Sequence, residues 1–445
     1  MNPCWRMRTW LVRLVVCGVA SAASAQDLNW TLCRGGQGIA QEGQVAGCTA
    51  VIQSRQESAK NRAYAYFIRA YVFAAQSEVD RAIADLDQAI ALDPKLADAS
   101  ANRGNAYRSK GDIDRAIADY TQMIAVAPDD ANGYNDRGNA YNEKGEFDRA
   151  IADLDLAIKI DPKFAFAYYN RGISYNNKGD QDRAIADYSE AIKLNPRDAF
   201  YFNNRGKAYA DKNDFEHALA DYDQAIKLDP KLALAFYNRA TDLRTQGQLD
   251  RALADFDRAI ELDPKYGPAY GNRARIWRDK GDIDRALADF NESLRLNPSN
   301  KLDYLARGDL FFGRADHQRA IADYSEVLRI DPRHAGALNN RCQVRAIVGQ
   351  LQDALADCNA SLAIRPDDAS TLDSRGFTYL KLGELDAAIA DYDAALKINA
   401  RLASSLYGRG VAERRNGDAA AAERDIAAAT ALSANIAEEF AKMAP

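Results

Sequence analysis

The chain has 445 residues, with 58 Lys and Arg against 64 Asp and Glu and a formal net charge of −6. This mildly acidic balance argues against nucleic acid as a partner, because nucleic-acid binding requires a basic face. Hydrophobic residues make up 47% of the chain, so the composition also excludes a disordered polymer and indicates a folded, helix-rich protein.

Residues 1–25 have the pattern of a cleaved signal peptide. Arginines supply a positively charged start, an apolar run spans 11–20, and Ala23 and Ala25 fit the small-residue rule of a cleavage site before Gln26. An uncleaved membrane anchor is the alternative, but the apolar run is shorter than the roughly 20 residues that span a bilayer. We therefore predict export, into the periplasm, with no membrane span after cleavage.

Residues 26–62 match the repeat that follows them only poorly. We predict that they form a degenerate helical pair that caps the array, because the end of a repeat array has no neighbour to cover it. Cys33 and Cys48 lie in this segment, and Cys342 and Cys358 lie in one later hairpin where its two helices meet. Both spacings suit a disulfide between antiparallel helices, and export favours oxidation. Buried thiols and a metal site are the alternatives.

A 34-residue period begins near Ala63 and continues over 63–436, in eleven copies, before a tail at 437–445. Numbering each copy from its first residue, we predict one helix over positions 1–14 and a second over positions 16–30. Glycine adopts the left-handed conformation that ends a helix at low cost. The glycines between the two helices include Gly111, Gly145, Gly179, Gly247, Gly281, Gly349, Gly383 and Gly417. A proline near position 32 then ends the second helix in most copies, so each copy is predicted to be an antiparallel helical hairpin.

The pattern resembles that of the tetratricopeptide repeat family. The second copy fills the family's small, aromatic and proline positions with Gly104, Tyr107, Ala116, Tyr120 and Pro128. The resemblance implies an all-α fold, a right-handed superhelical solenoid of antiparallel helix pairs, that binds protein or peptide partners. Because the chain carries no catalytic or metal-binding motif, we predict neither enzymatic activity nor a cofactor.

Position 7 is Arg and position 23 is Asp in all eleven copies. The arginines are Arg69, Arg103, Arg137, Arg171, Arg205, Arg239, Arg273, Arg307, Arg341, Arg375 and Arg409. The planar guanidinium group can bind a carboxylate through two hydrogen bonds. We predict that each Arg pairs with an Asp across a helix–helix seam, in its own copy or in the preceding one, with an array of anion sites as the alternative.

Positions 2, 5, 6, 9, 12 and 13 of the first helices remain for binding, and in a curved solenoid they line the concave surface. Position 6 is asparagine in six copies: Asn102, Asn170, Asn204, Asn238, Asn272 and Asn340. An amide offers both a donor and an acceptor, so such a row can pair with the backbone of an extended peptide. The row resembles the asparagine ladder of the O-linked N-acetylglucosamine transferase family. A merely solvated polar face is the alternative.

Four basic side chains make the middle of this surface basic, which suits an acidic ligand: Lys207, Arg244, Arg275 and Arg278. The predicted function is therefore protein–protein interaction along the concave face. The alternative is a structural scaffold in a cell-envelope assembly, such as polysaccharide or cell-wall machinery, that contacts its partners through its edges.

Overall fold

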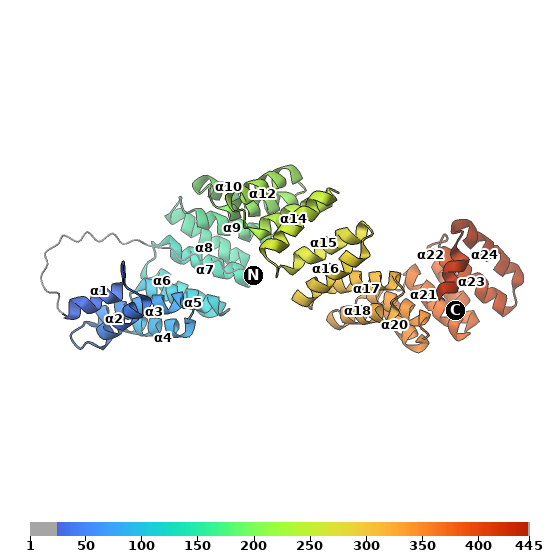
Figure 1. Ribbon diagram of the computed structural model, residues 1–445, viewed down its shortest axis with the longest axis horizontal. Coiled ribbons are helices and arrows are strands. Elements are labelled where there is room, and N and C mark those ends of the chain that lie inside the picture. The colour runs from blue at the N-terminus through green and yellow to red at the C-terminus, as the bar shows by residue number, and fades with distance from the viewer. Residues whose placement is uncertain (1–24, 444–445) are drawn as a thin grey trace. The chain divides into compact units, whose positions relative to one another are not determined.

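The computed structural model describes residues 25–443, so the predicted signal peptide lies, up to residue 24, outside the described part. Within residues 25–443 every regular element is a helix, numbered α1 to α25, and no strand occurs (Figure 1). None of the helices in this range is long and apolar enough to cross a membrane. The all-α class predicted from the sequence is confirmed.

The chain divides into two units, residues 1–238 and 239–445, and the division falls within α13. The helices before it are α1 (Ala25–Arg34), α2 (Gln41–Gln53), α3 (Ala59–Ala75), α4 (Val79–Leu92), α5 (Ala97–Ser109), α6 (Ile113–Val126), α7 (Ala131–Lys144), α8 (Phe147–Ile160), α9 (Ala165–Asn177), α10 (Gln181–Leu194), α11 (Ala199–Asp211) and α12 (Phe215–Leu228). From the division onward they are α13 (Ala233–Thr245), α14 (Leu249–Leu262), α15 (Gly267–Asp279), α16 (Ile283–Leu296), α17 (Lys301–Gly313), α18 (His317–Ile330), α19 (Ala335–Ile347), α20 (Leu351–Ile364), α21 (Ala369–Leu382), α22 (Leu385–Ile398), α23 (Ala403–Asn416), α24 (Ala419–Leu432) and α25 (Ile436–Met443).

The turn inside each hairpin is built as the sequence predicts. Gly111 has a φ of 79°, a left-handed conformation that ends α5. The next residue, Asp112, caps α6 by accepting a hydrogen bond from the backbone N–H of Arg115, which satisfies a donor that the first turn leaves free. Ser77, Asn213 and Ala315 replace the glycine in three copies and adopt the same left-handed conformation.

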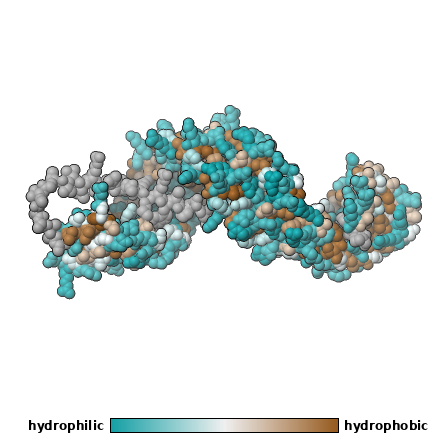
Figure 2. All heavy atoms as spheres, viewed as in Figure 1, coloured by the Kyte–Doolittle hydropathy of each residue, from teal (hydrophilic) through white to brown (hydrophobic). Residues whose placement is uncertain are grey.

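The two helices of a hairpin meet at small side chains. A Cβ added to Gly104 would lie 2.8 Å from the ring of Tyr120, which is fully buried together with Ala116. Close approach of the helices therefore depends on the small residue at position 8, the alanine at position 20 and the ring at position 24. The exposed surface between these seams is mostly hydrophilic, with hydrophobic side chains in scattered groups (Figure 2).

Each position-7 arginine pairs with the aspartate of its own copy. In the fourth copy, Nε and Nη2 of Arg171 donate to the two carboxylate oxygens of Asp187 at 2.8 and 2.7 Å. The same two bonds recur in all eleven copies. The predicted pairing is confirmed, and the aspartate belongs to the same hairpin.

The third guanidinium nitrogen of these arginines reaches the preceding hairpin. Nη1 of Arg171 donates to Asp155, at position 25 of the third copy, at 2.6 Å. The corresponding acceptors elsewhere are Thr49, Asp87, Thr121, Ser189, Asp257, Asn291, Ser325, Asn359 and Asp393. One side chain thus joins the helices of a hairpin to each other and to the hairpin before it.

The two cysteine pairs lie at bonding distance. The sulfur atoms of Cys33 and Cys48 are 2.05 Å apart between α1 and α2, and those of Cys342 and Cys358 are 2.01 Å apart between α19 and α20. Each bond joins the two helices of one hairpin. In the second pair the cysteines stand at positions 8 and 24, which a glycine and a tyrosine occupy in copies such as the second.

Candidate functional site

The predicted binding surface is best defined in the first unit. We call the side chains at positions 2, 5, 6, 9, 12 and 13 of α5, α7, α9 and α11 the first-helix face. Asparagines gather on it in consecutive copies: Asn102, Asn105, Asn132, Asn135, Asn139, Asn142, Asn170, Asn176, Asn177, Asn203 and Asn204. The hydrogen bonds of their amides separate the structural members from those that a ligand can reach.

Two of the six position-6 asparagines are buried and bind the first helix of the preceding copy. Asn170 is 7% exposed, and its amide nitrogen donates to the amide oxygen of Asn135 at 2.9 Å. Asn238 is 8% exposed and donates in the same way to Asn203 at 3.0 Å. Each pair joins position 6 of one copy to position 5 of the copy before it. These amides hold neighbouring first helices together.

Three other members of the row also donate within the protein. Asn204 donates to the hydroxyl of Tyr169 at 2.9 Å. In the second unit, Asn272 donates to the backbone oxygen of Pro268 at 3.0 Å, and Asn340 donates to the carboxylate of Asp309 at 3.2 Å. The amides of these three are therefore partly engaged.

Asn102 and Asn139 differ from these five asparagines. Both side chains are half-buried, and neither forms a hydrogen bond with any residue in the range 25–443. Asn102 is the position-6 residue of α5, whereas Asn139 stands at position 9 of α7, outside the predicted row. Beside them, the amide oxygen of Asn105 accepts a hydrogen bond from Tyr120 at 2.8 Å. The first-helix face therefore presents amide groups with unused donors and acceptors on α5 and α7.

Charged groups flank these amides but compensate one another. Nε of Arg108 lies 3.0 Å from a carboxylate oxygen of Glu143, so α5 and α7 are also joined by an ion pair. Burial raises the pKa of Tyr120, and the nearby carboxylate of Asp136 raises it further. The hydroxyl of Tyr120 therefore stays protonated and serves as the donor to Asn105.

The prediction of a basic middle is wrong for three of its four residues. Lys207 pairs with Asp211 at 2.8 Å within α11. In the second unit, Arg275 binds the fully buried carboxylate of Asp303 at 2.6 Å, and Arg278 binds its neighbour Asp279 at 2.8 Å. Each of these three positive side chains forms an ion pair with a carboxylate of the same chain. They therefore leave no excess positive charge for an acidic ligand.

Exposed aromatic side chains lie on the same face of the first helices. Phe166, at position 2 of α9, is 40% exposed, and Tyr64 and Tyr71 of α3 are 43% and 47% exposed. Tyr64 stacks on Phe67 with ring centroids 6.0 Å apart. These rings offer apolar contact area beside the amides, which is the combination that peptide-binding surfaces use.

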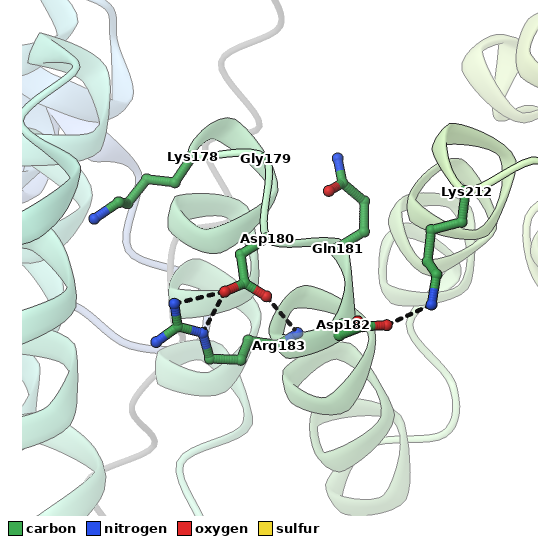
Figure 3. Close-up of a pocket in the computed structure, with 7 residues that line it drawn as sticks. All are labelled: Lys178, Gly179, Asp180, Gln181, Asp182, Arg183 and Lys212. Atoms are coloured by element: carbon green, nitrogen blue, oxygen red, sulfur yellow. Dashed lines mark hydrogen bonds and ion pairs between the residues drawn. The ribbon is translucent and has the colours of Figure 1, made fainter.

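A shallow pocket of about 380 Å³ opens at the hairpin turns of the fourth and fifth copies. Its lining residues are Lys178, Gly179, Asp180, Gln181, Asp182, Arg183 and Lys212 (Figure 3). The charges in it are already paired, since Asp180 binds Arg183 and Asp182 binds Lys212. Within residues 25–443 no group of His, Cys, Asp and Glu is arranged to hold a metal ion. The first-helix face is therefore a better candidate site than this pocket.

The buried amide pair predicts a structural effect for Asn170. Replacing Asn170 by Ala should lower the free energy of unfolding by about 1–3 kcal/mol, because the buried amide oxygen of Asn135 loses its donor. The matched control is Asn177→Ala on the same helix, where the side chain is exposed and makes no hydrogen bond in the described chain. Urea unfolding followed by circular dichroism measures both, and equal midpoints for the two variants would contradict the structural role.

Comparison with known families follows the repeat along the chain. Models described as TPR repeat or tetratricopeptide repeat match residues 70–107, 104–145, 138–179, 165–198, 206–241, 237–301, 305–369 and 376–417. No curated protein sequence matches the chain significantly.

Several solved structures are similar to parts of the chain. YrrB, described as a TPR protein with an unusual peptide-binding site, is 25% identical over 42% of this chain and 97% of its own, with a TM-score of 0.34. MamA is 26% identical over 36% of this chain and 95% of its own, with a TM-score of 0.33. Yeast Tom70 is 16% identical over 86% of this chain and 94% of its own, with a TM-score of 0.36.

Proposed function

Because the chain belongs to the tetratricopeptide repeat family, whose members bind protein or peptide partners, we propose that it binds extended segments of partner proteins along the concave, first-helix face of its first unit. The observation that carries the proposal is the pair of half-buried amides of Asn102 and Asn139, which have no partner among residues 25–443. Because these donors and acceptors are not used within the described chain, a peptide backbone that pairs with them can take the place of water.

The chemistry of this face favours backbone recognition over recognition of a particular side chain. An asparagine amide donates to a peptide carbonyl and accepts from a peptide N–H. The exposed ring of Phe166 adds an apolar contact, which suits an aliphatic or aromatic side chain of the ligand. The buried pairs, Asn170 with Asn135 and Asn238 with Asn203, fix the spacing of the helices, so the face is rigid before the ligand arrives and binding costs less entropy.

The double variant Asn102→Ala/Asn139→Ala tests the proposal. An array of unstructured peptides of varied sequence should bind the parent chain and lose about tenfold or more in affinity to the variant, which corresponds to about 1.4 kcal/mol. The matched control is Gln88→Ala/Gln122→Ala, which removes two exposed amides from the second helices α4 and α6. Neither double variant should change the unfolding midpoint, because none of the four amides bonds within the described chain.

Unchanged peptide binding by the asparagine variant would refute the proposal. If the control variant alone lost binding, contacts would lie on the second helices, and the structural scaffold that works through its edges would be favoured. Full loss of binding in both double variants would point to a general change of the surface and not to a defined site.

We further propose that the chain works in an oxidising compartment outside the cytoplasm. The signal-like pattern of residues 1–25 and the two cysteine pairs at bonding distance both support this location, because disulfides persist in exported proteins and are rare in the cytosol. A periplasmic partner is therefore the first class to seek.

A further inference from the structure

The C-terminal helix α25 is held to the second unit by two side chains. Ile436 and Phe440 stand four residues apart, on one face of the helix, and are 4% and 6% exposed. The residues between and after them, Ala437, Glu438, Glu439, Ala441 and Lys442, are exposed. α25 is thus an amphipathic helix with one aliphatic and one aromatic anchor.

The aromatic anchor occupies a surface that corresponds to the first-helix face. The ring of Phe440 lies edge-on to Phe377 of α21, with centroids 5.5 Å apart, and 5.1 Å from the ring of Tyr407 of α23. Phe377 stands at position 9 and Tyr407 at position 5 of their copies. Position 9 carries Asn105 and Asn139 on α5 and α7, so this position is polar on those two helices and aromatic at Phe377.

The remaining contacts of α25 are also apolar. Ile436 packs in a cluster with Leu406 of α23 and Ala429 of α24, and Phe440 shares a cluster with Leu380 of α21 and, at its border, Val411 of α23. Within residues 25–443, Glu438, Glu439 and Lys442 form no ion pair or side-chain hydrogen bond with this surface. Two apolar anchors carry the attachment.

Such an attachment is easily reversed. An eight-residue helix is far shorter than the roughly 12–15 residues that an isolated helix needs to be stable in water, so α25 is helical because of its contacts. Segments that have few buried contacts open at lower free energy than the body of the fold. The surface beneath α25 is therefore exposed for part of the time.

We propose that the corresponding surface of α21 and α23 is a groove for an amphipathic helix of a partner protein that carries an aliphatic and an aromatic residue four apart, and that α25 is its resident competitor. Placing an amphipathic helix in an apolar groove is a common mode of peptide recognition. The groove lies in the second unit, so this inference stands apart from peptide binding by the asparagines of the first.

The test uses a fluorescent peptide with the sequence of residues 434–443 and three full or nearly full chains. The parent chain should bind it weakly, because α25 occupies the groove and lowers the competent fraction. The variant Phe440→Ala and a chain that ends at Asn435 should both bind it about tenfold or more tightly. A peptide in which Ala replaces the residue equivalent to Phe440 should not bind any of them.

Two further peptides decide whether the groove recognises a class of helix. A peptide of unrelated sequence that keeps Ile and Phe four apart on an amphipathic helix should bind the Phe440→Ala chain, and a scrambled peptide of the same composition should not. Binding of the native sequence alone would make α25 a fixed cap and overturn the proposal.

Equal binding to the parent chain and to Phe440→Ala would also overturn it, as would no binding to a Phe440→Ala chain whose circular dichroism is unchanged. Because that variant keeps the whole chain, the result holds even if the shortened chain fails to fold. Concentration-dependent dimerisation of the parent chain that the peptide abolishes would assign the groove to α25 of a second copy and not to a partner.

Discussion

Replacing Arg171 by Met is expected to lower the free energy of unfolding by about 3–5 kcal/mol, the range for removing one partner of a buried ion pair. The carboxylate of Asp187 is 6% exposed and takes both of its charged hydrogen bonds from this one guanidinium group. Without it, Asp187 must either stay charged in a poorly solvated seam or take up a proton, and both cost folding free energy.

The pKa shifts of the two partners disagree on whether the pair is charged. Hydrogen bonding to Asp187 raises the pKa of Arg171, which favours the charged guanidinium. Burial raises the pKa of Asp187 even beside Arg171, which disfavours the charged carboxylate. The two short, parallel hydrogen bonds are those of a charged pair, so we take both groups as charged at neutral pH and burial as the cost that the pair offsets.

Substitution of the other partner, Asp187, should lower the free energy of unfolding by less. Asp187→Asn keeps an acceptor for Arg171, whose third nitrogen remains bound to Asp155 at 2.6 Å. The double variant Arg171→Met/Asp187→Leu should recover most of the stability, because it leaves no unpaired charge in the seam. Urea unfolding by circular dichroism gives the total, and hydrogen exchange of the amides in α9 and α10 shows whether the loss is local, as expected for a repeat array.

An exposed pair supplies the control for this series. Arg183 binds Asp180 in the same copy, but at the hairpin turn and in contact with solvent. Arg183→Met should leave the unfolding midpoint almost unchanged, because exposed ion pairs contribute little. If the effects of Arg171→Met alone and Asp187→Leu alone simply added in the double variant, the two residues would not be energetically coupled.

The sequence is sufficient to predict the Arg–Asp pair of each hairpin, but not the acceptor in the preceding hairpin that binds the third nitrogen of the arginine. Arg171 and Asp187 recur with one residue type at a fixed spacing, so the period reveals them. The acceptor at position 25 varies among Asp, Asn, Ser and Thr. These residues share only an oxygen that can accept a hydrogen bond, and a search for repeated residue types therefore misses them.

The asparagines show a different limit. Position 6 identifies a common helix face, but whether Asn170 points to a ligand or to its neighbour depends on the residue 35 positions earlier. Asn135 and Asn203 precede Asn170 and Asn238 by that spacing, and both pairs are buried. For Asn102 the residue at that position is Phe67, which offers no acceptor. The sequence therefore does contain the information that decides the role of each asparagine. It lies in the pairing of residues from two neighbouring copies, which a comparison of equivalent positions does not reveal.

The short tail shows the third limit. Residues 437–445 follow the last copy with no periodic pattern, and among the described side chains at 436–442 of α25 only Ile436 and Phe440 are buried. Two anchors are too few to define an amphipathic pattern against the background of the sequence. Their importance depends on Phe377 and Tyr407, which come from two different copies.

Removing the disulfide of the ninth copy is expected to lower the free energy of unfolding by about 2–4 kcal/mol. Cys342→Ala/Cys358→Ala abolishes the link between α19 and α20, so the unfolded chain gains the freedom that the closed loop denied it. It also removes the two sulfur atoms from the buried seam, and the small cavity that they leave adds to the cost.

A second double variant separates the covalent link from the packing. Cys342→Gly/Cys358→Tyr restores the pair that stands as Gly104 and Tyr120 in the second copy, where the ring is fully buried against the glycine. It should be more stable than the alanine variant, because it refills the seam without a disulfide. Reductant should then weaken hydrogen-exchange protection in α19 and α20 of the parent chain and leave this variant unaffected.

Thiol alkylation completes this test of the oxidised state. The parent chain, purified without added reductant, should take up no alkylating reagent at Cys342 or Cys358 until it is unfolded in the presence of reductant. Labelling after unfolding without reductant would contradict the disulfide, because unfolding alone exposes a buried thiol but does not cleave a bond between two sulfur atoms. The comparison therefore distinguishes the disulfide from the alternative of two buried thiols.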